Sequence, residues 1–114
     1  MVFIESRMFS RRLSQLAGAQ ADSILTAIQG DLIENPLHGR MVPGLGGICK
    51  ARTSNPARGK GKRGGFRYLY LYLETRRHIH LLFLLDKNEQ EDMTEEQRRQ
   101  IREMVSQIKR ETGG

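Results

Sequence analysis

The pattern of hydrophobic and polar positions predicts three helices, two near the N-terminus and one at the C-terminus. In the first, apolar residues recur at steps of four and three from Phe9 to Leu16, which is the spacing of one helix face. The second ends before Pro36, because a proline drives the residue before it out of the helical region. A Thr-Glu-Glu-Gln run from Thr94 fits a capping box and starts the third. The expected helices cover residues 7–17, 22–34 and 95–111.

Strict alternation of side chains predicts strands in the middle of the chain. Over 66–73, leucines and aromatic residues occupy alternate positions from Tyr68 onward, so each set faces one side of a strand. A strand over 48–53 precedes it, and a strand over 78–85 follows it after a turn. The apolar residues of 78–85 occupy both parities, which predicts a central strand that is covered on both faces.

The order helix, helix, strand, strand, strand, helix is typical of an α+β fold. We expect two N-terminal helices and a C-terminal helix to pack on one face of a small antiparallel β-sheet. The chain has 114 residues and no internal repeat, so residues 1–114 are expected to form a single domain. The glycine-rich stretches 39–47 and 54–65 are expected to be loops between the strands.

Composition excludes several classes of protein. With 38% hydrophobic and 28% charged residues, the chain is typical of a soluble globular domain. Its longest charge-free apolar run, 79–85, is too short to span a bilayer, and residues 1–10 lack the apolar core of a signal peptide. Cys49 is the single cysteine and cannot form an internal disulfide, which favours the cytoplasm. It is expected to be a small core residue rather than a nucleophile.

The net charge of +6 is unevenly distributed along the chain. Between residues 35 and 73 there is no Asp or Glu, and eight of the twelve glycines fall between 39 and 65. A basic block without compensating acids predicts a polyanionic partner, although a solvated face without a task is the alternative. Its cations are Arg40, Lys50, Arg52, Arg58, Lys60, Lys62, Arg63 and Arg67.

Four cations fall where neighbouring strands begin or end. Lys50 and Arg52 are two residues apart on the first predicted strand, so they project from one face. Arg67 begins the second strand, and Lys87 follows the third. If neighbouring strands pair, the four side chains converge at one end of the sheet.

Other chemistry is weakly indicated. His78 and His80 face the same side of a strand, but no third metal ligand is evident, so we expect partly exposed strand histidines and no metal. The run from Gly44 to Gly47 suggests a phosphate loop, yet it lacks the Lys-Ser/Thr pair and precedes a strand instead of a helix. The sequence therefore predicts no cofactor.

Three stretches, 44–52, 58–70 and 86–94, resemble the RelE/ParE superfamily of toxins, and the HigB-type branch most closely. The Gly-Lys-Gly-Lys-Arg-Gly-Gly run before Arg67 and the Lys-Asn-Glu run from Lys87 carry most of the likeness. The resemblance implies a fold of two N-terminal helices on an antiparallel sheet. It also implies ribosome-dependent cleavage of mRNA and neutralisation by a cognate antitoxin, for which a helix-turn-helix protein is expected.

The resemblance also implies where the reaction takes place. RNA cleavage without a metal uses the ribose 2′-OH as nucleophile, and arginines can clamp the phosphorane that forms. A lysine among other cations loses its proton more readily, so either lysine of the site is expected to act as acid or base. The catalytic candidates are Lys50, Arg52, Arg67 and Lys87. The candidates for binding rRNA or mRNA are Arg58, Lys60, Lys62, Arg63 and, by stacking on a base, Tyr70. On an ideal strand Tyr70 faces away from Arg67, so packing in the core is the alternative for this residue.

The sequence departs from the family pattern at Leu85, where an aromatic residue is common, and no tyrosine follows Tyr72. Three alternatives stay open. A ParE-type gyrase poison shares the fold and acts through protein contact. A protein that binds RNA without cutting it, or a basic ribosomal or nucleoid protein, would carry the same charge.

Overall fold

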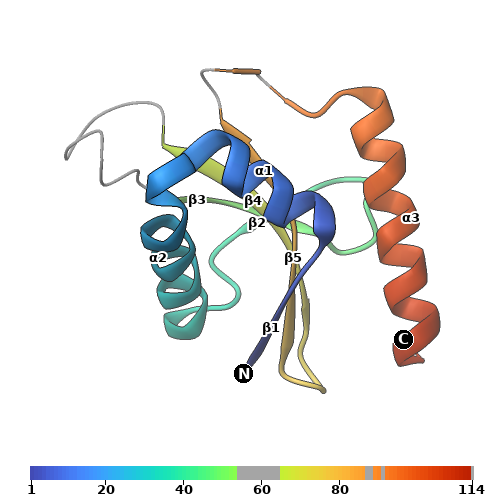
Figure 1. The fold of residues 1–114 in the computed structure, drawn as a ribbon. Coiled ribbons are helices and arrows are strands. Elements are labelled where there is room, and N and C mark those ends of the chain that lie inside the picture. Colours follow the sequence, from blue (N-terminus) through green and yellow to red (C-terminus); the bar gives the residue numbers. More distant parts are fainter. Residues whose placement is uncertain (54–64, 87–88, 91, 114) are drawn as a thin grey trace.

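The computed structural model describes residues 1–53, 65–86, 89–90 and 92–113, which form one five-stranded sheet with helices around it (Figure 1). The strands are β1 (Val2–Glu5), β2 (Arg40–Met41), β3 (Cys49–Thr53), β4 (Phe66–Leu73) and β5 (His78–Asp86). The helices are α1 (Arg7–Ala17), the 3₁₀ turn η1 (Gly18–Gln20), α2 (Ala21–Glu34) and α3 (Glu95–Thr112). The predicted α+β class is confirmed. No described helix combines the length and the apolar character that crossing a bilayer requires.

The sheet has the order β1-β5-β4-β3-β2. β4 pairs antiparallel with both β3 and β5, and β5 lies between β4 and β1, as its apolar pattern predicted. Two strands were missed in the sequence. β1 pairs parallel with β5, so the sheet is mixed and not purely antiparallel. β2 has only two residues, and β1 has four, so neither is long enough for an alternating pattern to stand out.

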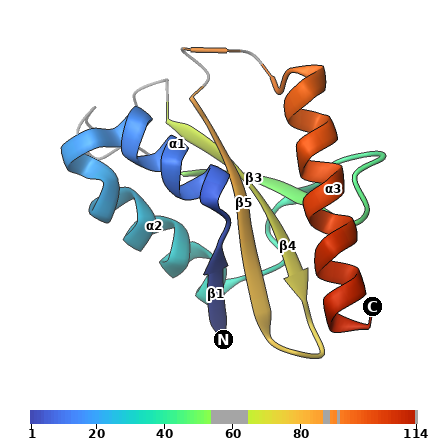
Figure 2. The same cartoon turned by 45° about the vertical axis from the view of Figure 1, so that its right-hand side comes forward.

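Helices cover both faces of the sheet, which corrects the expectation of one covered face (Figure 2). The tyrosines of β4 pack in one core with α1 and α2, and its leucines pack in a second core with α3. Because β4 carries large apolar side chains at both parities, each face must be buried. We call these two sides the tyrosine face and the leucine face.

α3 is held against the leucine face by its cap and its apolar stripe. The Thr94 hydroxyl accepts a hydrogen bond from the Gln97 amide, and the Gln97 side chain accepts one from the Thr94 amide, which confirms the predicted capping box. Ile101 and Val105 are buried against the sheet. The cap residue Thr94 directly follows Met93, whose side chain is packed in the same core.

Candidate functional site

Strand pairing brings four cations onto the leucine face. Arg52 lies opposite Arg67 on β4, and Lys50 lies opposite Leu69 on one side and Arg40 of β2 on the other. Residues that are directly opposite project to the same side of a sheet, with Cβ atoms about 4.5–5.5 Å apart. The predicted convergence of Lys50, Arg52 and Arg67 is therefore confirmed. We call Arg40, Lys50, Arg52 and Arg67 the basic cluster.

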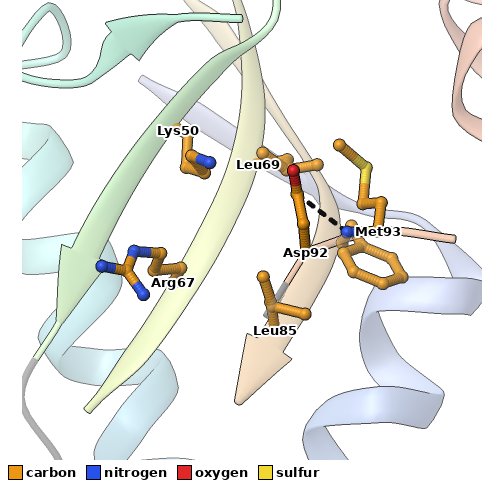
Figure 3. A pocket seen from close by; sticks show the side chains of 7 residues that line it. Lys50, Arg67, Leu69, Leu85, Asp92 and Met93 are labelled. Atoms are coloured by element: carbon orange, nitrogen blue, oxygen red, sulfur yellow. Dashed lines mark hydrogen bonds between the residues drawn. The ribbon is translucent and has the colours of Figure 1, made fainter. Parts of the chain in front are cut away.

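Part of the basic cluster lines a pocket with an apolar floor (Figure 3). Lys50 and Arg67 lie on its sheet side, and Asp92 lies on the opposite side, in the segment before α3, while the Arg67 guanidinium points toward β3. The Met93 amide donates to Asp92 Oδ1 at 2.8 Å, which fixes the direction of the carboxylate. The apolar side chains that complete the lining are Leu69, Phe83, Leu85 and Met93.

The positive charge of the basic cluster is not neutralised by ion pairs among the described residues. Within residues 1–53, 65–86, 89–90 and 92–113, none of its four side chains forms an ion pair or a hydrogen bond with another side chain. Like charges placed directly opposite on a sheet destabilise it, so the Arg52–Arg67 pair costs free energy in the isolated protein. By contrast, Arg99 on α3 is paired with two glutamates. An uncompensated cluster of this kind is suited to binding an anion.

Arg12 of α1 connects this pocket to the opposite side of the sheet. Its guanidinium lies 4.4 Å above the centroid of the Phe83 ring, and its Nε donates to the Leu84 carbonyl. Its Nη2 lies 3.2 Å from Glu89 Oε1, in the segment that leads to Asp92. Nothing in the local sequence separates Arg12 from the other arginines of α1, so this contact could not be predicted.

The proposed stacking role of Tyr70 is wrong. Tyr70 is 0% exposed and lies in the core of the tyrosine face, on the other side of the sheet from the basic cluster. Its hydroxyl donates to the Pro36 carbonyl at 2.9 Å and accepts from the Gly39 amide at 3.0 Å. A Cβ on Gly39 would lie 2.7 Å from this hydroxyl, so only glycine allows the approach. Tyr70 thus anchors the segment between α2 and β2.

Cys49 and the strand histidines show no arrangement suited to catalysis. Cys49 is half-buried, and its burial raises the pKa of the thiol, which disfavours the reactive thiolate. Among the described residues, no group of three or more His, Cys, Asp or Glu could hold a metal ion. Burial lowers the pKa of His80, whose Nε2 is buried and finds no hydrogen-bond partner in the described part of the chain.

Some predicted site residues lie outside the described residues, namely Arg58, Lys60, Lys62, Arg63 and Lys87. Two residues of the site were not assigned to it from the sequence. Arg40 was placed in a loop, because β2 is too short to recognise. Asp92 belongs to an acidic run, and only the fold brings it opposite Lys50 and Arg67. No sequence signal separates Asp92 from its acidic neighbours.

The fold and the basic cluster define a small α+β protein whose cations on one sheet face have no ion-pair partner in the described part of the chain. A family model described as the RelE toxin of the RelE / RelB toxin-antitoxin system matches residues 6–113. The chain therefore belongs to the RelE toxin family. The closer likeness to HigB-type toxins stays a prediction.

Solved structures share the fold at low sequence identity. The RelBE2 toxin-antitoxin complex from Mycobacterium tuberculosis is 21% identical, with a TM-score of 0.57 over 75% of this chain and 95% of that one. The isolated E. coli RelE toxin is 13% identical, with a TM-score of 0.53 over 94% of this chain and 97% of that one. A mutant E. coli RelE in the free state is 11% identical, with a TM-score of 0.55, and 79% of this chain and 86% of that one are covered.

Proposed function

We propose that this RelE-family toxin cleaves mRNA on the ribosome, in the cytoplasm, by attack of a ribose 2′-OH on the adjacent phosphodiester. RelE-family toxins are in general endoribonucleases, and membership of this family supports the proposal. The observation that carries the proposal is a basic cluster without ion-pair partners among the described residues, beside the pocket lined by Lys50, Arg67 and Asp92. An RNA phosphate bound there supplies the negative charge that the cluster lacks.

The arginines stabilise the transition state. Attack of the 2′-oxygen on phosphorus gives a phosphorane with added negative charge, and departure of the 5′-oxygen leaves a 2′,3′-cyclic phosphate and a 5′-OH. Arg52 and Arg67, which lie opposite each other, present two planar guanidinium groups to the phosphate oxygens. A guanidinium binds two phosphate oxygens at once, so the pair can hold the phosphorane more tightly than the ground state.

Two protons must move in this reaction. One leaves the attacking 2′-OH, and one reaches the departing 5′-oxygen. Lys50 lines the pocket on the same side as Arg67, and we assign it one of the two transfers. Asp92, which lines the same pocket, is a candidate to accept the proton of the 2′-OH, because an ionised carboxylate accepts a proton. Lys50 then donates the proton to the departing 5′-oxygen. Lys87 lies outside the described residues and stays a predicted alternative.

The ribosome supplies the geometry. The basic cluster consists of exposed and half-buried side chains on a sheet face, so it does not enclose an RNA strand by itself. Holding the mRNA so that the 2′-oxygen is in line with the leaving oxygen can lower the barrier by several kcal/mol, about 7 or more in favourable cases. Dependence on the ribosome follows from this need for alignment.

The direct test compares Arg67 variants on ribosomes that carry an mRNA. We expect Arg67→Ala to lower the cleavage rate by about 10²–10³-fold, since it removes a charged donor from the transition state. Arg67→Lys should recover part of the rate, because it keeps the charge and loses the bidentate geometry. Arg11→Ala is the matched control, since Arg11 is exposed on α1 at the other face of the sheet.

Two results would count against the proposal. Intact mRNA after incubation with the wild-type protein, together with cleaved DNA trapped on gyrase, would favour the ParE-type alternative. Ribosome binding without any cleavage would favour an RNA-binding protein without catalysis.

We also propose a cognate antitoxin with a helix-turn-helix domain as a partner. Two structures that share this fold are the M. tuberculosis RelBE2 toxin-antitoxin complex and the intact E. coli RelBE toxin-antitoxin complex. An uncompensated basic cluster can be masked by an acidic segment of such a protein. The test is co-purification with the product of the neighbouring gene, and rescue of growth by that product. Failure of the neighbour both to bind and to rescue growth would contradict the assignment.

A further inference from the structure

A second basic groove lies between α3 and the loop that joins β2 to β3. In Figures 1 and 2 this loop reaches across the end of the sheet to the middle of α3. The groove is open and holds about 420 Å³ of space, solvent included. Its lining consists of Gly44, Leu45, Gly46, Arg102, Val105, Ser106 and Lys109.

Glycine brings the loop onto the helix. Gly44 and Gly46 have φ values of 75° and 72°, a backbone conformation that favours glycine. A Cβ on Gly46 would lie 3.1 Å from Val105 Cγ1 and 3.3 Å from Lys109 Nζ. The absent side chain therefore allows the Lys109 ammonium to lie directly against the loop backbone. This gives a structural role to a glycine run that has no P-loop signature.

The groove carries uncompensated positive charge. Arg102 and Lys109 are seven residues apart, which places them on one side of α3 with Ser106 between them. Neither forms an ion pair or a side-chain hydrogen bond within the described residues. Glu103, which lines the adjoining depression, accepts from Arg99 at 2.7 Å. The carboxylate nearest to the groove in the sequence is thus already paired.

The groove and the basic cluster lie on the same side of the sheet. The position of a Cβ on Gly47 is 3.7 Å from Leu71 Cδ1, and Leu71 is four residues from Arg67 on β4. Four residues of a strand span about 13 Å. Leu69 and Leu71 are buried in one core with Val105 of α3, so a strand that joins Arg67 to the groove passes over the outer surface of this core. A strand of a few nucleotides is long enough to reach both.

We propose that this groove binds a second backbone phosphate of the RNA strand whose reacting phosphodiester lies at the basic cluster. The inference deepens the proposed function, because the ligand is the same strand. Single-stranded nucleic acid is held by cations that follow its backbone, and glycine and serine let a phosphate approach closely. The short separation of the two sites on the α3 side of the sheet favours one RNA strand over a second, unrelated ligand.

The experiment measures RNA binding by the purified protein in the absence of ribosomes. The probes are fluorescent 2′-O-methyl RNA oligonucleotides of three and ten nucleotides, which cannot be cleaved by 2′-OH attack, and affinity is followed by anisotropy from 50 to 200 mM salt. The variant is R102Q/K109Q, whose glutamines preserve helix propensity. The matched control is R7Q/R11Q, which removes two exposed cations from α1 on the other face of the sheet.

The expected result is specific to the long probe. Each phosphate contact contributes about 0.7 to the salt slope of single-strand binding, so losing the contact to the groove phosphate should lower the slope by about 0.7. Between 50 and 200 mM salt, wild type should lose about 2.6-fold more affinity for the ten-nucleotide probe than the variant does. The control and the three-nucleotide probe should show no such difference. Ser106→Glu, which places an anion in the groove, should weaken binding of the long probe in the same way.

Other outcomes overturn the inference. An unchanged salt slope in R102Q/K109Q, or an equal loss in the control, means that the groove contacts no phosphate. Lost antitoxin binding with unchanged RNA binding means that it contacts a protein. Failure of the proposed function can be told apart from failure of this inference. If only the proposed function fails, the wild-type protein leaves mRNA intact on ribosomes, while its RNA affinity still depends on probe length and salt as described.

Discussion

Replacement of Arg12 by alanine should destabilise the protein more than any other single change on the exposed side of α1. Arg12 is 14% exposed and makes three contacts that alanine cannot make. Its hydrogen bond to the Leu84 carbonyl is charge-assisted and contributes about 1.5–3 kcal/mol. Its position over the Phe83 ring adds about 1 kcal/mol, and the ion pair with half-exposed Glu89 adds less than about 1 kcal/mol. Arg12→Ala should therefore cost about 3 kcal/mol.

The Leu84 contact dominates for a topological reason. β1 pairs with β5 only as far as Leu81, so the later carbonyls on that edge of β5 need other donors. The Ser6 hydroxyl donates to the Leu82 carbonyl at 2.9 Å, and Arg12 donates to the Leu84 carbonyl. Without Arg12, a carbonyl at the edge of a packed core loses its partner.

Urea unfolding of Arg12→Ala, Arg11→Ala and Glu89→Gln provides the measurement. Arg11 is the neighbouring exposed arginine and forms no ion pair within the described ranges, so its replacement should change the free energy of unfolding by less than about 0.5 kcal/mol. Glu89→Gln should cost less than about 1 kcal/mol. If Arg12→Ala costs no more than Arg11→Ala, the reasoning on the β5 edge is refuted.

Three further outcomes follow from individual contacts. Tyr70→Phe removes the hydroxyl between Pro36 and Gly39 and should lower the free energy of unfolding by about 1–3 kcal/mol, while cleavage per folded molecule is unchanged. For His80, burial lowers the folded pKa below its ordinary value of 6.5, so the unfolded chain binds more protons and stability falls as pH drops through 6.5. His80→Gln should flatten this loss when urea unfolding at pH 7.5 and 5.5 is compared. Asp92→Asn should lower the cleavage rate by about 10²-fold, whereas an unchanged rate would remove Asp92 from proton transfer.

The sequence predicted the elements whose periodicity runs long enough to be unambiguous. α1 and β4 agree with the predicted ranges, and the capping box marked the start of α3. β1 and β2 were missed because pairing with longer strands, and not their own pattern, defines them. The expectation of helices on one face failed, because the aromatic and aliphatic residues of β4 are both apolar and each requires a cover.

The candidate site was predictable only as far as strand alternation reaches. Alternation placed Lys50 and Arg52 on one face, and the antiparallel pairing of β3 with β4 added Arg67. The contributions of Arg40, Asp92 and Arg12 depend on tertiary packing that no local pattern encodes. Alternation also placed Tyr70 on the face opposite Arg67, and its burial confirms packing in the core.

The measurement that tests the central claim most directly is the end chemistry of mRNA recovered from programmed ribosomes. With the wild-type protein, we predict fragments that end in a 2′,3′-cyclic phosphate and begin with a 5′-OH, and a loss of these fragments with Arg67→Ala. Uncut mRNA with the wild-type protein, or equal cleavage by Arg67→Ala, would contradict the account.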